Sequence, residues 1–135
     1  MSVKFVFWGI ILSGLAVIFG AFGAHVLADI FNNMDPEPHS TPPMQTFNTG
    51  VQYQFFHGLA LILTGSLYRQ KSTRQVKNAG LLFLIGVILF SGSLYMITIG
   101  HAMHRSFKFV GPLTPLGGIS MTIGWILLAM TFHKK

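Results

Sequence analysis

Two histidines, His25 and His57, lie inside or at the edge of long apolar segments, where an imidazole can ligate a metal or relay protons. A haem held by two histidines needs both ligands at matching depths on facing helices. His25 falls about one helical turn from the end of its segment, whereas His57 falls ~15 Å into the next one. This difference in depth argues against a shared haem. We expect both rings to hydrogen-bond across a helix bundle to groups such as Gln54, Ser91 or Tyr95, with a proton relay as the functional alternative.

The other candidate metal ligands stand in polar stretches between the apolar segments. Three imidazoles with nearby carboxylates could bind copper or zinc. Their spacing matches no compact ligand motif such as His-Glu-x-x-His, so we expect solvated side chains, no metal and no cofactor. These residues are His39, His101 and His104, with Asp29, Asp35 and Glu37.

The groups that usually carry out catalysis are missing from the sequence. Cysteine is absent, which excludes thiolate metal sites and thiol redox chemistry. There is no Ser-His-Asp set, no pair of carboxylates and no glycine-rich phosphate loop, and the apolar segments hold no Asp or Glu that could act as a general base. We therefore expect no catalytic residues, and a protein that is not an enzyme.

The charged residues show which elements must position these side chains. Only 9% of the 135 residues are charged, against about 25% in soluble domains, and 51% are hydrophobic, with a mean hydropathy of +0.59. All charges fall in five short stretches that leave four charge-free segments, each long enough for a helix that crosses a ~30 Å hydrocarbon core. Their apolar runs do not alternate as barrel strands do. The sequence predicts an all-α membrane protein, a single domain with four transmembrane helices at about residues 5–28, 47–68, 79–100 and 109–133.

Lysine and arginine counts predict how these helices are oriented. With four spans, both termini and the basic 69–78 loop share a side that holds seven Lys and Arg residues, whereas the 29–46 and 101–108 stretches hold two, Arg105 and Lys108, and all three acids. The positive-inside rule then places both termini in the cytoplasm. We expect the cell inner membrane, or alternatively the mitochondrial inner membrane. The basic loop has no base-reading groups, so we expect contacts with anionic lipid headgroups and none with nucleic acid.

Small residues recur every three or four positions on several predicted helices, which allows close approach of a neighbouring helix. The stretch around Ser91 and the start of the last helix could instead line a solute path, although no span carries the charge that ion-coupled carriers usually need. The candidate packing or partner-facing residues are Gly9, Ser13, Gly20, Gly23, His25, Gln54, His57, Gly58, Ser91, Gly92, Tyr95, Thr114, Pro115, Gly117 and Gly124.

The predicted outer loop, residues 29–46, holds four of the six prolines. Proline-rich segments favour extended conformations and exclude a long helix. The loop is therefore either a solvated linker or a docking surface for another subunit.

Four blocks of sequence stand out along the chain: residues 20–25 (GAFGAH), 49–61 (TGVQYQFFHGLAL, preceded by Phe47), 90–95 (FSGSLY) and 113–118 (LTPLGG, followed by Gly124 and Trp125). Together they resemble a known family of small bacterial membrane proteins of unknown function, the YgdD/YwdK-like proteins (domain of unknown function 423). The similarity spans nearly the whole chain, with one departure, a longer and more proline-rich stretch at residues 32–43. The resemblance implies a four-helix membrane fold and brings no established activity.

Two functional hypotheses follow. In the first, the protein is an accessory or assembly subunit of a larger membrane complex, for example a respiratory or other redox complex, held through its small-residue stripes and outer loop. In the second, it is a small-solute or ion transporter or channel that acts as a homo-oligomer, with a polar track through Gln54, His57 and Ser91. The two differ in what the stripes on the first and last helices contact.

Overall fold

The computed structural model describes residues 1–34 and 41–133, except for the side chain of Lys108. Within these ranges the chain is helical, with no strand, which confirms the predicted all-α class. The long helices are α1 (Ser2–Phe22), α3 (Pro43–Gln70), α4 (Arg74–Ala102) and α5 (Leu113–His133). A π-helical turn (Gly23–Leu27) joins α1 to α2 (Ala28–Asn32), and a short 3-10 helix (Lys108–Val110) precedes α5. Predictions concerning Asp35, Glu37, His39, Lys134 and Lys135 fall outside the described residues.

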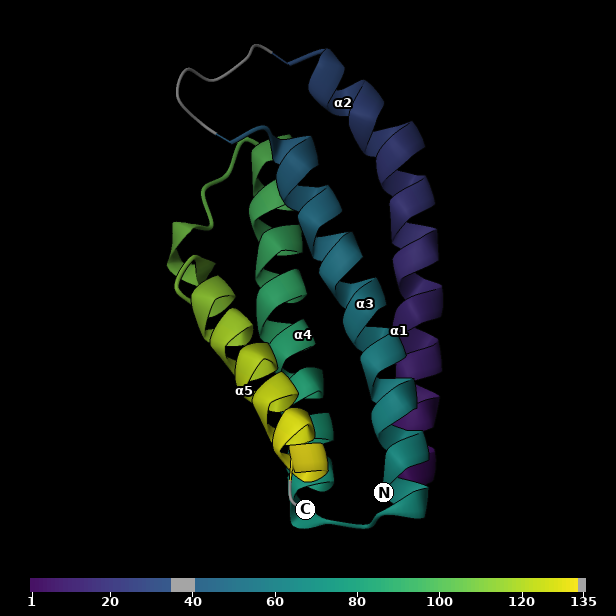
Figure 1. Cartoon of the computed structure of the whole chain (residues 1–135). Coiled ribbons are helices and arrows are strands. Elements are labelled where there is room, and N and C mark those ends of the chain that lie inside the picture. Colours follow the sequence, from purple (N-terminus) through teal and green to yellow (C-terminus); the bar gives the residue numbers. More distant parts are fainter. Residues whose placement is uncertain (35–40, 134–135) are drawn as a thin grey trace.

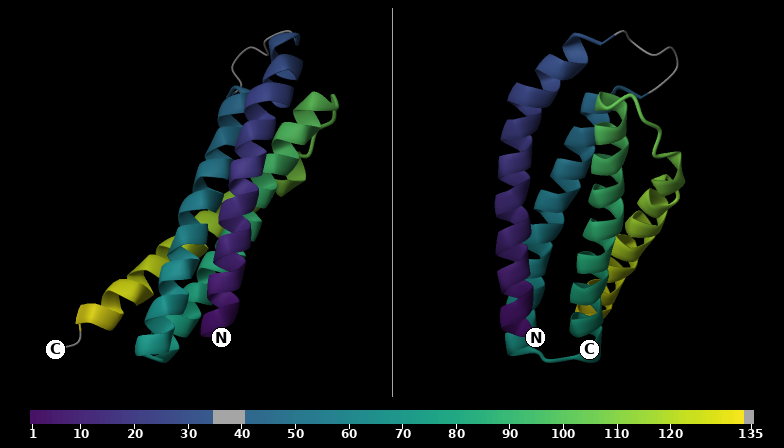
Figure 2. Two further views of the ribbon diagram at one scale, coloured as in Figure 1. Left: turned by 90° about the vertical axis from the view of Figure 1, so that its right-hand side faces the viewer. Right: turned by 180° about the vertical axis from the view of Figure 1, so that it is seen from behind.

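The long helices pack in sequence order, each antiparallel to the next. α3 packs against α1 and α4, and α5 packs against α4, so α1 and α5 form opposite edges of the bundle (Figure 1). The start of α1, the α3–α4 turn and the end of α5 lie at one end of the bundle, as Figure 2 also shows from two further sides. The last turns of α5 diverge from α1 and α3 (Figure 2). The connection between α3 and α4, residues 71–73, forces these two helices to run antiparallel, because so few residues cannot return the chain along a helix of ~40 Å.

Three of these helices are long and apolar enough to cross a membrane by length and composition: Ser2–Asn32, Arg74–Ala102 and Leu113–His133. The other long helix of the described chain, α3, does not reach that hydropathy, although it carries no charge before Arg69. Its N-terminal half contains several polar side chains, among them the amides of Gln45, Asn48 and Gln52. Absence of charge and high hydropathy are different criteria, and α3 satisfies only the first.

The observed helix ends differ from the limits of the charge-free segments that were used to predict them. α3 starts at Pro43 and not near residue 47, with proline in the first turn, where its missing N–H has no intrahelical partner. α4 starts at Arg74, where the Thr73 hydroxyl accepts a hydrogen bond from the Val76 N–H at 3.3 Å, so the basic loop shrinks to residues 71–73. The first helix continues past residue 28 to Asn32, and the last begins at Leu113 and not at residue 109. Charges mark the limits of an apolar segment, and a helix can extend beyond them into water.

Small residues allow the backbones to approach closely within two helix pairs. Between α1 and α3, a Cβ added to Gly9 would lie 2.6 Å from the Gly58 carbonyl oxygen, and Gly58 in turn lies against Ser13. Between α4 and α5, a Cβ on Gly117 would lie 2.8 Å from Cβ of Phe90. The stripes on the first and last helices therefore neither contact each other nor face outward. Each is covered by its own neighbour in the chain.

A hydrophobic core closes the end of the bundle where the chain starts. Leu61 from α3, Val76 and Phe83 from α4, Phe5 from α1 and Leu128 from α5 are all buried there. Side chains from all four long helices thus meet at this end, and they link α1 with α5 although these two helices are not neighbours.

Replacement of Gly9 by alanine should lower the stability of the bundle by ~1–3 kcal/mol, because its Cβ would meet backbone atoms of α3 that cannot move aside. Gly14, on the same helix, is the matched control, since its Cβ would have nothing within 4 Å. Gly14→Ala should be neutral or stabilising by up to ~1 kcal/mol through helix propensity. Thermal unfolding of the two purified variants in detergent measures both stability changes. Equal effects of the two substitutions would contradict the close packing of α1 on α3.

Candidate functional site

The polar side chains predicted to matter meet in one cluster, built by the buried face of α3 and the facing side of α4. Gln54 is at its centre and is only 4% exposed. Its Nε2 donates to the Leu12 carbonyl oxygen of α1 at 2.9 Å, and its Oε1 accepts from the Tyr95 hydroxyl of α4 at 2.8 Å. One side chain therefore ties three helices together.

His57, one turn further along α3, uses both of its ring nitrogens. Nδ1 lies 2.9 Å from the Tyr53 carbonyl oxygen, which can only accept a hydrogen bond, so Nδ1 carries the proton. Nε2 then accepts from Trp125 Nε1 of α5 at 3.3 Å. This arrangement suits the neutral ring and leaves neither nitrogen for a metal. His57 therefore hydrogen-bonds across the bundle as predicted, but to Trp125 and not to Gln54, Ser91 or Tyr95. A proton relay through His57 would first have to break its bonds to Trp125 and to the Tyr53 carbonyl.

Hydroxyl groups form further links between helices. The Ser91 hydroxyl of α4 donates to the Gly50 carbonyl oxygen of α3 at 2.8 Å, and Ser120 of α5 donates to the Leu82 carbonyl oxygen of α4 at 2.8 Å. Ser93 and Thr114 join α4 to the start of α5 at 2.6 Å. Each bond satisfies a hydroxyl in surroundings that offer no water, so the polar track that could have served a solute is occupied by contacts within the protein.

The remaining predicted residues are placed apart from this cluster. His25 is exposed on the π-helical turn, and Pro115 is exposed near the start of α5. Gly20 has space for a Cβ, with Val51 3.5 Å away, and Gly92 has nothing within 4 Å. The other small residues face a neighbouring helix: Gly23 lies against Phe47, and Gly124 against Phe83. The Ser13 hydroxyl is buried without a hydrogen-bond partner in the described part of the chain.

Trp125 is the member of the cluster that sequence reasoning missed. It lies on α5, 68 positions along the chain from His57, and its ring centroid is 5.0 Å from that of Phe83. An indole N–H inside an apolar segment needs an acceptor, and this was the signal in the sequence. The sequence did not indicate which residue would be the acceptor, because helical periodicity does not reveal which helix lies opposite.

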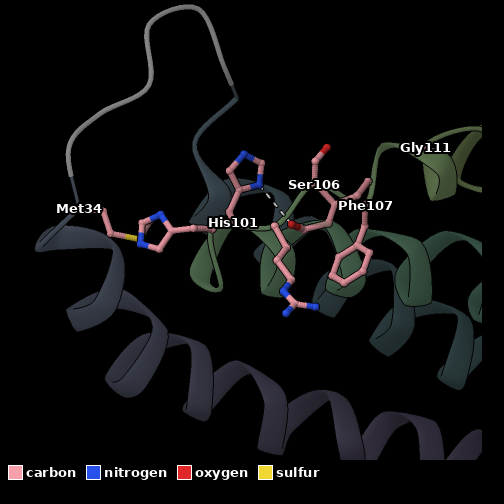
Figure 3. A pocket seen from close by; sticks show the side chains of 8 residues that line it. Met34, His101, Ser106, Phe107 and Gly111 are labelled. Carbon is pink, nitrogen blue, oxygen red and sulfur yellow. Dashed lines mark hydrogen bonds between the residues drawn. The ribbon is translucent and has the colours of Figure 1, made fainter.

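A cavity of about 580 Å³ opens at the end of the bundle where α4 ends, lined by Met34, Ile97, His101, His104, Arg105, Ser106, Phe107 and Gly111 (Figure 3). His101 Nδ1 bonds to the Ile97 carbonyl oxygen at 3.1 Å, the dashed line in Figure 3. His104, with a positive φ of 52°, turns the chain after α4. These two imidazoles line the same cavity, but no group of three or more metal-ligating side chains comes together among the described residues.

A second cavity, of about 400 Å³, lies at the opposite end of the bundle. It is lined by residues from the α3–α4 turn, from the first turn of α4 and from the last turn of α5: Lys71, Thr73, Arg74, Gln75 and Thr131. Both cavities are thus at the ends of the helices, outside the buried polar cluster.

Replacement of Gln54 by leucine should destabilise the bundle by ~1–2 kcal/mol, because it leaves the partly buried Tyr95 hydroxyl and the Leu12 carbonyl without their partner. Tyr95→Phe in the Gln54→Leu background removes the unpaired hydroxyl and should recover part of the loss. Thermal unfolding of the two single variants and the double variant measures the coupling. Strict additivity would mean that the Gln54–Tyr95 bond contributes nothing.

Comparisons with known proteins assign the family. The family described as protein of unknown function (DUF423) matches residues 19–118. The chain is 36% identical to the UPF0382 membrane protein YwdK of Bacillus subtilis over 96% of each protein, and 33% identical to the UPF0382 inner membrane protein YgdD of Escherichia coli over 95% of this chain and 88% of YgdD. It is also 35% identical to the UPF0382 membrane protein SAB0533 of Staphylococcus aureus, over 96% of this chain and 95% of that protein. No solved structure matches.

These names and the three apolar helices confirm a membrane protein of the cell inner membrane, in contact with lipid. The resemblance predicted from the four sequence blocks is likewise confirmed. By the match over residues 19–118 and by its relatives, this chain belongs to the DUF423 family of membrane proteins.

Proposed function

We propose that this protein is a non-catalytic, four-span accessory subunit that packs against a larger membrane protein through the outer half of α3. The observation that carries the proposal is an exposed row of carboxamides, Gln45, Asn48 and Gln52. Their spacing of three and four residues places them on one face of the helix. None of the three side chains hydrogen-bonds to another residue in the described part of the chain.

The position of Gln52 makes this exposure costly in a membrane. Arg69 is the first charged residue of α3 and marks its basic end, and Gln52 lies ~25 Å along the helix from it, within a hydrocarbon core of ~30 Å. An amide without a hydrogen-bond partner in an apolar medium costs several kcal/mol. A partner helix that offers polar groups would remove this cost, because carboxamides both donate and accept hydrogen bonds.

The rest of the exposed α3 face is apolar and suits lipid. Phe56, Leu59 and Leu63 continue the row toward the basic end and are 58%, 46% and 49% exposed. The small-residue stripes that first suggested a partner are covered within the chain, so the partner would meet carboxamides and not glycines. Because every side-chain nitrogen and oxygen of His57 and Gln54 has a hydrogen-bond partner within the protein, a structural role is favoured over chemistry at that cluster.

The proposed topology has four spans with both termini in the cytoplasm. Support for α3 as the fourth span comes from its packing along α1 and α4 and from its lack of charge between Pro43 and Tyr68. Support for the orientation comes from Lys4, Arg69, Lys71, Arg74 and Lys77 at one end, against Arg105 and Lys108 at the other.

Single cysteines can test this topology cleanly, because the chain has none of its own. A cysteine at Ser72, in the α3–α4 turn, should react with an impermeant thiol reagent only after the cytoplasmic side is exposed. A cysteine at Thr41, which is exposed just before the start of α3, should react in intact cells or spheroplasts. Labelling of both from the same side would refute α3 as a span.

A photo-crosslinker at Gln52 should capture a single larger protein in native membranes, because the side chain at this position faces the proposed partner. Leu63 is the matched control, on the same exposed face of the same helix but in its apolar half. A crosslinker there should give no protein adduct. Electrophoresis followed by mass spectrometry identifies the products.

Two outcomes of this experiment would count against an accessory subunit. Equal crosslinking from Gln52 and Leu63 would indicate random collision. A discrete product of twice the chain mass would indicate self-association through α3 and would favour the alternative, a homo-oligomeric transporter or channel, because carboxamide rows are self-complementary in a two-fold dimer.

A further inference from the structure

The cavity at the basic end of the bundle has the composition of an anion site. Its lining contains two cations, Lys71 and Arg74, a hydroxyl from Thr73 and an amide from Gln75, with no acidic residue. Arg69 and Lys77 flank these residues in sequence. Among the described residues the single carboxylate side chain is Asp29, which lies in α2 at the other end of the bundle (Figure 1). No described acidic side chain therefore neutralises the positive charge here.

Hydrogen bonds hold the walls of this cavity in place. Lys71 Nζ donates to the Thr131 carbonyl oxygen at 3.2 Å, which ties the α3–α4 turn to the last turn of α5. Carbonyls in a last helical turn lack intrahelical partners, so this bond also caps α5. A lysine ammonium has three N–H groups, and two of them stay available to a ligand. The Thr73 hydroxyl fixes the start of α4 by its bond to the Val76 N–H.

The same cavity borders the surface that faces lipid. Met130 and Phe132, on either side of Thr131 in α5, are 47% and 67% exposed. Both α4 and α5 are apolar enough to span the membrane. The ends of these two helices next to the cavity would therefore lie at the membrane surface. A ligand with a phosphate in the cavity and an apolar chain along α5 would satisfy both the cations and these side chains. Free phosphate would satisfy only the cations.

We propose that this cavity binds the phosphate group of an anionic phospholipid, with Lys71 and Arg74 as its charged ligands. Arginine can hold two phosphate oxygens at once, and lysine contributes a compact point charge. Basic pockets between transmembrane helices are suited to such headgroups. This site is independent of the partner proposed for α3, since it lies at the other end of that helix.

The test uses the purified full-length chain in mild detergent, with phosphatidylglycerol as the probe and phosphatidylcholine as the neutral lipid. Native mass spectrometry measures the retained lipid, and thermal unfolding measures lipid-dependent stabilisation. The wild-type chain should prefer phosphatidylglycerol. The double variant Lys71→Gln/Arg74→Gln should lose about tenfold or more of that preference, as expected from removal of two cations near the headgroup.

The matched control is Lys4→Gln/Arg105→Gln, which removes the same charge without altering the cavity lining and should keep the preference. If the double lining variant does not fold, Arg74→Gln alone leaves the Lys71–Thr131 bond in place and should still lose several-fold. An equal loss in the control would overturn the proposal, because net charge would then explain the binding. Equal stabilisation of the wild-type chain by inorganic phosphate without lipid would overturn the assignment to a phospholipid.

Discussion

Inside a membrane there is no water to drive apolar surfaces together, so helices associate by how closely their backbones can approach and by the polar bonds they can share. In this protein the first condition is met where Gly9 and Gly58 bring α1 onto α3, and where Gly86 and Gly117 bring α5 onto α4. Each pair joins a helix at the edge of the bundle to a helix in its middle. A methyl group at these contacts would collide with backbone atoms, and the position of every polar group in the interior depends on this spacing.

The polar groups are the second consequence of the same solvent. Several side chains, among them Gln54, Ser91 and Ser120, bond to carbonyl oxygens of a neighbouring helix, so they fix the relative positions of elements that glycine contacts bring together. Gln54 links α1, α3 and α4, and His57 links α3 to α5. In the described part of the chain, the Ser13 hydroxyl is the buried side-chain group that lacks a hydrogen-bond partner.

The surface has two polar features that lipid tails do not suit. One is the carboxamide row on the outer half of α3, and the other is the basic cavity between α4 and α5. They lie near opposite ends of the bundle and differ in chemistry. Neutral amides match a protein helix that can exchange hydrogen bonds, whereas clustered cations match a phosphate. Together they are the basis of the two proposals, a protein partner at α3 and an anionic phospholipid at the basic cavity.

The sequence alone determined the class of this protein, because the cost of charge in hydrocarbon confines charged residues to the ends of the helices. It also indicated packing faces on the first and last helices, since small residues recur there at the helical period, whereas Gly92 on α4 has nothing within 4 Å of an added Cβ. It could not determine which helix lies opposite each face. Trp125 and His57 meet because α3 and α5 both pack against α4, a pairing that no local pattern encodes. Likewise Gln52 and Gln54 look alike in the sequence, but a rotation of ~100° per residue sends one outward and the other into the bundle. Only the tertiary structure, by packing α1 and α4 against the face of α3 that carries Gln54, decided which of the two would be satisfied within the chain.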